Sequence, residues 1–174
     1  IHIFSILKVV PIAIAAFILA RILGINRLIS FGIGLIFSLN TFNLIRAEGH
    51  FFLALTWSLP LGIAAIFIAF KQVHKDLPRS GRDIGAVISL CSLSFLSGFY
   101  YTFFLIIFAI TTLVYLVIFI ILNAAKITFF GRVKNSLRLL SLPILVLILF
   151  ILGLFIQTFP ILVRSKRILN LTGL

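Results

Sequence analysis

The sequence predicts an all-α fold, a polytopic transmembrane helical bundle of about six spans, and three observations predict it. Hydrophobic residues make up 63% of the 174 residues and charged residues 10%, whereas an ordinary soluble domain carries roughly 25% charged residues. Several continuous apolar runs approach or exceed the ~20 residues that a helix needs to cross about 30 Å of hydrocarbon. The basic residues cluster between these runs, where loops of membrane proteins carry them.

The net charge of +12 does not indicate a nucleic-acid partner, because the basic residues occupy short connections and no basic domain separates from the apolar runs. The single cysteine, Cys91, excludes an intrachain disulfide and a cysteine-based metal site. The chain opens with Ile1 and contains no methionine. We therefore expect residues 1–174 to form a single transmembrane helical region that is a fragment of a longer membrane protein.

The first three spans are expected in the N-terminal half of the chain. The first covers about residues 9–20 and extends toward Ile3 if a basic side chain reaches the membrane interface. The second covers about 28–44 and the third 51–70. Pro60 should kink the third span, because proline removes a backbone donor and clashes with the preceding turn.

The next apolar block, 84–122, is too long for one helix and breaks best at Ser97-Gly98. Its first part, 84–97, is roughly 21 Å long at 1.5 Å per residue, so this span is short or re-entrant. We expect its serines to be buried against neighbouring helices rather than exposed to lipid; they are Ser89, Ser92, Ser94 and Ser97. The fifth span runs from the break to about residue 122, and the sixth covers 139–159.

Charge sets the predicted orientation. The connections 71–83 and 123–138 carry eight lysines and arginines, which favours the cytoplasm for both. An even number of spans must separate them, and the broken block supplies two. The polar stretch 43–50 and the turn 97–101 then lie together on the opposite, exoplasmic face. The basic residues of 164–167 would also lie outside, and there charge and span counting disagree.

The polar stretch is the candidate site, because ionisable residues at the edge of a membrane span are costly and often functional. Arg46 is a bidentate phosphate donor, and a helix that starts near His50 attracts anions. Glu48 could orient the arginine or accept a hydrogen bond from a substrate hydroxyl. With Tyr100 and Tyr101 on the same face, these residues indicate a phosphate or polar-headgroup site.

The alternative interpretation is structural. Arg46 and Glu48 would form an ion pair at the interface, and His50 would cap the helix that follows. No metal site is expected, because Glu48 and His50 supply only two ligands.

Two segments carry a resemblance to a known family. The first comprises Phe42-Asn43, Arg46-Ala47-Glu48-Gly49-His50-Phe51-Phe52-Leu53 and Leu59-Pro60-Leu61, and the second is Ser97-Gly98-Phe99-Tyr100-Tyr101-Thr102-Phe103-Phe104. In order and spacing they resemble bacterial polytopic membrane proteins of the GT-C glycosyltransferase type, over residues 28–122. The resemblance implies transfer of a sugar from a polyprenyl-phosphate carrier at the exoplasmic face of the bacterial cytoplasmic (inner) membrane, in cell-envelope assembly.

One feature departs from that family. Its enzymes generally use an acidic residue in the first exoplasmic loop, whereas this chain has three acids and the orientation above puts Asp76 and Asp83 in the cytoplasm. The catalytic residue is therefore unknown and lies outside the fragment, as would any divalent metal, or the protein is not a transferase. The rival interpretations are a transporter or lipid-linked-glycan flippase subunit, and a non-catalytic packing module in the lipid bilayer.

Overall fold

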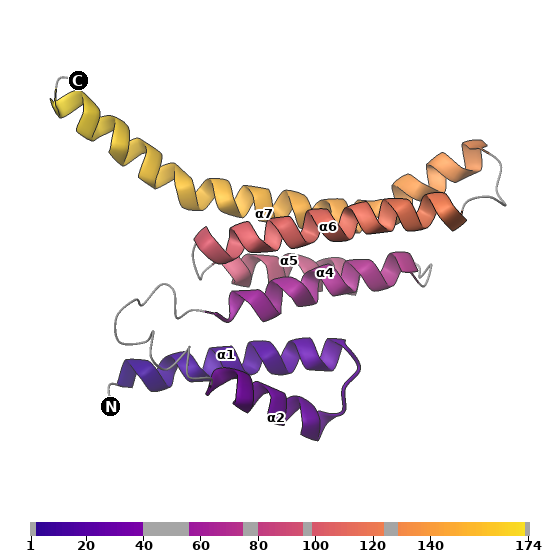
Figure 1. Cartoon of the computed structure of the whole chain (residues 1–174), viewed down its shortest axis with the longest axis horizontal. Helices are drawn as coiled ribbons and strands as arrows, with labels where there is room; N and C mark the ends of the chain where they lie inside the picture. Colours follow the sequence, from indigo (N-terminus) through magenta and orange to yellow (C-terminus); the bar gives the residue numbers. More distant parts are fainter. Residues whose placement is uncertain (1–2, 40–55, 75–79, 96–98, 124–128, 173–174) are drawn as a thin grey trace.

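The computed structural model describes residues 3–39, 56–74, 80–95, 99–123 and 129–172 (Figure 1), and within these ranges the chain is helical and contains no strand. The helices are α1 (Ile3–Ile22), α2 (Arg27–Ser38), α4 (Ser58–His74), α5 (Gly81–Ser94), α6 (Phe99–Asn123) and α7 (Phe129–Thr172). The predicted all-α class is confirmed.

Successive helices run in opposite directions, so their starts and ends gather at two opposite ends of the bundle (Figure 1). One end is where α1, α4 and α6 finish and where α2, α5 and α7 begin. We call it the basic end, because four exposed cations of the described ranges lie there, namely Arg21, Arg27, Lys71 and Arg82. At the other, the distal end, α2 and α5 finish and α4 and α6 begin. The helix ends that flank 43–50 and 97–101 thus lie at the same end, which agrees with the alternation predicted from charge.

Two helical stretches among the described residues are long and apolar enough to cross a membrane, namely Tyr100–Leu122 in α6 and Leu140–Pro160 in α7. Three shorter apolar stretches, of 10–17 residues, are Val9–Ile22, Arg27–Ser38 and Ser58–Val73. The second predicted span is shorter than expected, because α2 ends at Ser38.

Pro60 does not kink its helix as the sequence predicted. Pro60 is the third residue of α4, which then continues to His74; a first-turn position needs no backbone donor, so proline is tolerated there. The predicted kink in the middle of this helix is wrong. Prolines do lie inside α1, at Pro11, and inside α7, at Pro143 and Pro160. The 44 residues of α7 bend away from the bundle toward the C-terminus (Figure 1).

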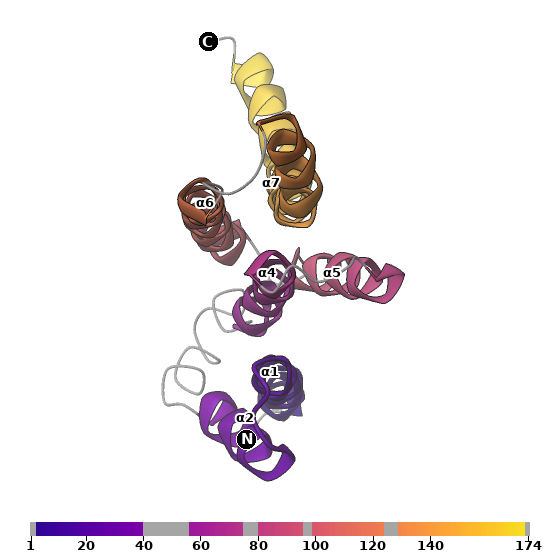
Figure 2. The same ribbon diagram turned by 90° about the vertical axis from the view of Figure 1, so that its right-hand side faces the viewer.

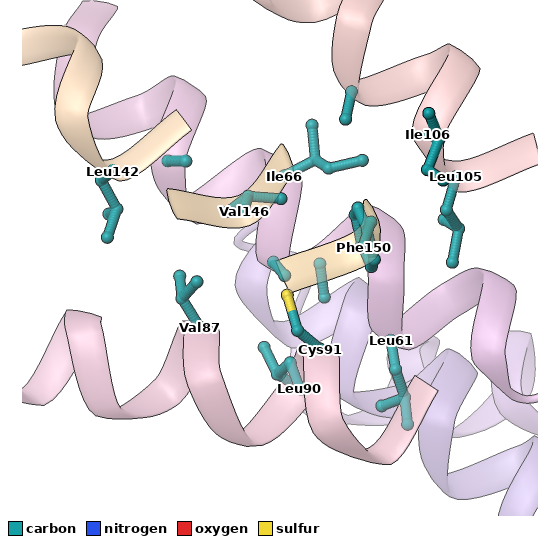
Figure 3. Packing of buried hydrophobic residues seen from close by; sticks show 14 of the residues in the cluster. Leu61, Ile66, Val87, Leu90, Cys91, Leu105, Ile106, Leu142, Val146 and Phe150 are labelled. Atoms are coloured by element: carbon teal, nitrogen blue, oxygen red, sulfur yellow. The ribbon is translucent and has the colours of Figure 1, made fainter. Parts of the chain in front are cut away.

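Helix α4 lies at the centre of the bundle and packs against α1, α5, α6 and α7 (Figure 2). Its buried face is built from small side chains, with Ala64 and Ala65 fully buried and Ala69 nearly so. The facing residues of α5, α6 and α7 recur at helical spacing (Figure 3); they are Val87, Leu90, Cys91, Leu105, Ile106, Ala109, Leu142, Val146 and Phe150. One continuous apolar core therefore joins these helices.

The serines of α5 divide between two faces. Ser94 and Cys91 are fully buried, and with Val87 and Leu90 they follow the i, i+3, i+4, i+7 spacing of one helix face. Ser89 and Ser92 are exposed on the other face. The prediction that the serines are buried is therefore wrong for these two, because a 3.6-residue period cannot place 89 and 92 beside 91 and 94; Ser97 lies outside the described residues.

Helices α1 and α2 form a tight antiparallel hairpin. The turn uses Gly24 at φ 87°, a conformation that favours glycine. Asn26 then caps α2, its side chain accepting a hydrogen bond from the Ile29 amide at 2.9 Å. A Cβ on Gly34 would lie 2.7 Å from the backbone oxygen of Ala13, so the absence of a side chain sets the distance between the two helices.

We predict that Gly34→Ala destabilises this hairpin by about 1–3 kcal/mol, since a backbone atom cannot move aside as a side chain can. Gly32→Ala is the matched control, because a Cβ there meets nothing within 4 Å and alanine favours helix over glycine by up to ~1 kcal/mol. Unfolding in mixed detergent micelles measures both variants. Equal stability of the two would show that Gly34 does not limit the approach of α1 and α2.

Candidate functional site

The five residues predicted for the site are only partly described by the structure. Arg46, Glu48 and His50 lie in 40–55, outside the described residues. Tyr100 and Tyr101 begin α6 at the distal end, where Tyr101 is 8% exposed and Tyr100 is 63% exposed. Successive residues on a helix point about 100° apart, so one tyrosine faces the bundle and the other faces outward.

The end of α5 is held by α7. Gln157 donates a hydrogen bond from Nε2 to the backbone oxygen of Phe95, the residue that follows the last turn of α5. One turn earlier, a Cβ on Gly153 would lie 2.4 Å from the Phe95 ring. Phe150 meets the same ring edge-on, with centroids 6.1 Å apart. We call this the α5–α7 contact.

The α5–α7 contact has an electrostatic reason. The last carbonyls of a helix have no partner within the helix, and an unsatisfied carbonyl in an apolar surrounding costs several kcal/mol. With 14 residues, α5 is roughly 21 Å long, short of the ~30 Å hydrocarbon core. An amide placed inside the apolar stretch Leu140–Pro160 supplies the hydrogen bond that the end of this short helix lacks.

Three buried polar atoms at the distal end have no hydrogen-bond partner in the described part of the chain: Trp57 Nε1, Ser58 Oγ and Gln157 Oε1. Ser58 is fully buried. Each such atom costs about 1–3 kcal/mol when it stays unpaired, and native proteins leave few of them. We call these the three unpartnered atoms.

Further neutral polar side chains are buried at the distal end. Thr56, Ser94 and Thr102 are buried there as well, and the Ser94 hydroxyl donates to the Cys91 carbonyl at 2.7 Å. The three unpartnered atoms are an obligate donor, an obligate acceptor and a hydroxyl that does both. This arrangement can bind neutral polar groups by hydrogen bonds.

Sequence reasoning missed Trp57, Ser58 and Gln157. A signal was present for Gln157, since an amide inside an apolar membrane segment generally faces another helix. Trp57 and Ser58 gave no such signal, because both precede Pro60 in a run that reads as the middle of a span. Their place at the end of the bundle follows from the start of α4 at Ser58.

The polar contacts of the basic end are structural. Gln72, buried near the end of α4, donates to Asp83 Oδ2 at 3.0 Å. Ser80 caps α5 by accepting from the Arg82 amide at 3.2 Å, and Asp83 in the first turn suits the positive end of the helix dipole. Within the described residues no three His, Cys, Asp or Glu side chains gather as metal ligands would.

An apolar groove of about 400 Å³ runs between α4 and α6. It is lined by Ile63, Ile66, Phe67, Phe70, Phe108, Thr111, Thr112 and Tyr115. The two threonine hydroxyls donate to carbonyls of their own helix at 2.9 Å, Thr111 to Ile107 and Thr112 to Phe108. The groove therefore offers hydrocarbon and aromatic surface, which suits an apolar chain better than a polar ligand.

We predict that Gln157→Leu loosens the end of α5, because the Phe95 carbonyl then stays unpaired at a cost of about 1 kcal/mol or more. Hydrogen exchange over residues 91–95 should accelerate severalfold, as local opening becomes easier. Thr158→Val is the control, since the Thr158 hydroxyl bonds only to carbonyls of its own helix, at 3.0 and 3.1 Å. Unchanged exchange in Gln157→Leu would contradict the role given to the amide.

The chain matches no protein-family model, no curated protein and no solved structure. The resemblance of 28–122 to GT-C glycosyltransferases therefore stays a prediction. The function must be argued from the chain's own residues, and the described part that carries most weight is the set of buried neutral polar groups at the distal end.

Proposed function

We propose that the chain is the membrane core of a multi-pass protein of the bacterial cytoplasmic membrane, which handles a polyprenyl-phosphate-linked sugar at its distal end as a GT-C-like glycosyltransferase of cell-envelope assembly. One observation carries the proposal. The helix ends that flank the polar stretch 43–50 lie at the end of the bundle that holds the three unpartnered atoms. The proposal therefore assigns the charged residues of 43–50 to the same end as these neutral polar groups.

The proposal includes six segments that cross or enter the bilayer. The outward faces of α6 and α7 support it, since they expose large apolar side chains along their length; examples are Phe103, Phe104, Ile107, Val114, Ile118, Ile148, Ile151 and Phe155. An apolar surface of this extent marks a membrane or protein contact. The shorter helices α2 and α5 would enter the bilayer against longer neighbours.

In the proposed reaction Arg46 and His50 hold the phosphate of the lipid carrier, and Glu48 orients the arginine. The acceptor hydroxyl attacks the anomeric carbon, the bond from that carbon to the carrier phosphate breaks, and the hydroxyl proton passes to a carboxylate of the full-length protein. Tyr101 lies at the start of α6 on the bundle side. The apolar groove between α4 and α6 suits part of the prenyl chain.

A transporter or flippase of lipid-linked glycans is the second candidate, and the α5–α7 contact favours it. Helices that stop inside the membrane and expose backbone carbonyls commonly line substrate pathways, and α5 stops where Gln157 meets Phe95. The two candidates differ in product: a transferase lengthens an acceptor glycan, whereas a flippase moves the intact carrier between leaflets. Assays of reconstituted full-length protein for both products separate them.

The topology of the proposal predicts the location of reporter fusions. Fusions after Lys75 and after Lys134 should both report the cytoplasm, and a fusion at Gly98 should report the exoplasm, because basic connections are retained inside. If Lys75 and Gly98 report the same side, α5 does not cross, and the segment 84–97 enters and leaves by one face.

The donor site predicts a graded response at Arg46. In the full-length protein, Arg46→Ala should abolish binding of a polyprenyl phosphate while membrane insertion stays normal. Arg46→Lys should restore binding only in part, because a point charge does not reproduce bidentate geometry, and Glu48→Gln should weaken it. If Arg46 and Glu48 form only an exposed ion pair worth about 0–1 kcal/mol, all three variants will bind as the unmodified protein does.

A further inference from the structure

We infer that the distal end contains a hydrated inlet, in which water bonds to Trp57 Nε1, Ser58 Oγ and Gln157 Oε1 at the point where α5 stops. The inference concerns water rather than substrate. It holds equally for a transferase and a transporter, so it does not depend on the proposed function.

Helix α5 ends near the distal part of the apolar stretch of α7. Gln157 lies within the stretch Leu140–Pro160, and its Nε2 bonds to the carbonyl of Phe95, so the end of α5 lies at a similar depth. The apolar residues of α7 continue to Val163, and Arg164 is the next charged residue. Water entering from the distal face therefore needs to pass about two turns of α7 to reach the amide.

The three unpartnered atoms have complementary hydrogen-bonding roles. Nε1 of Trp57 can only donate, Oε1 of Gln157 can only accept, and Oγ of Ser58 does both. All three are buried with no partner in the described part of the chain, and such groups usually indicate water that bonds to them. A buried water needs two to four polar partners, and this set supplies both kinds.

The three unpartnered atoms belong to neutral side chains, a tryptophan, a serine and a glutamine. Water satisfies a neutral donor and a neutral acceptor without a counter-charge. The next charged residue of α7 after Gln157 is Arg164, about two helical turns away.

The test uses Ser58→Cys in the chain reconstituted in vesicles, with a membrane-impermeant maleimide added to the distal face. The native Cys91 is fully buried, and its labelling in the unmodified chain is the background rate. Because a thiol must ionise to react, labelling reports water at the sulfur. Ser58→Cys should react at least tenfold faster than the control Ser38→Cys, a fully buried serine at the distal end of α2 whose hydroxyl donates to the carbonyl of Leu35 at 3.0 Å.

A second measurement needs no substitution, because Trp57 is the chain's single tryptophan. In a hydrated inlet, acrylamide in the water should quench its fluorescence efficiently, and lipids with brominated acyl chains should quench it weakly. The inference is overturned if Ser58→Cys reacts no faster than Ser38→Cys. It is also overturned, even where Ser58→Cys fails to fold, if brominated lipid quenches Trp57 and acrylamide does not.

Discussion

Ala64, Ala65 and Ala69 give α4 a face along which other helices approach closely. Four helices, α1, α5, α6 and α7, pack around it, and these alanines are buried to 2% exposure or less. In the bilayer location proposed above, the hydrophobic effect would not drive the helices together, because lipid is as apolar as the side chains, and close van der Waals packing between small residues would do so instead. The same requirement recurs at Gly34, where α2 meets the backbone of α1.

Central packing on α4 has a consequence for the distal end. Helix α5 aligns its buried face, from Val87 to Ser94, with the alanine face of α4 and then stops. The backbone carbonyl left behind needs a donor, and Gln157 supplies it. Because one amide nitrogen is used in this way, the amide oxygen is fixed in a buried place without a partner. The buried oxygen of Gln157 thus follows from the place where α5 ends.

The sequence sufficed for the helical class and for the alternation of direction, because apolar length and basic clusters report on them directly. It did not suffice for helix faces. In a membrane segment the lipid-facing and protein-facing sides are both apolar, so Ser89 and Ser92 could not be told from Ser94 before the neighbours of α5 were known. The sequence also did not show where helices start. Within the long apolar run 51–70, Pro60 predicts a kink, but α4 begins at Ser58 and Pro60 is therefore a first-turn residue.

The neutral character of the buried polar groups at the distal end agrees with the cost of burying charge. A charged side chain is far more expensive to bury than a hydroxyl or an amide, so charges belong at the aqueous boundary and neutral groups can lie deeper. The described polar groups deep in the distal end, at Ser58, Thr102 and Gln157, are neutral. A ligand that reaches these groups therefore meets only neutral hydrogen-bond donors and acceptors.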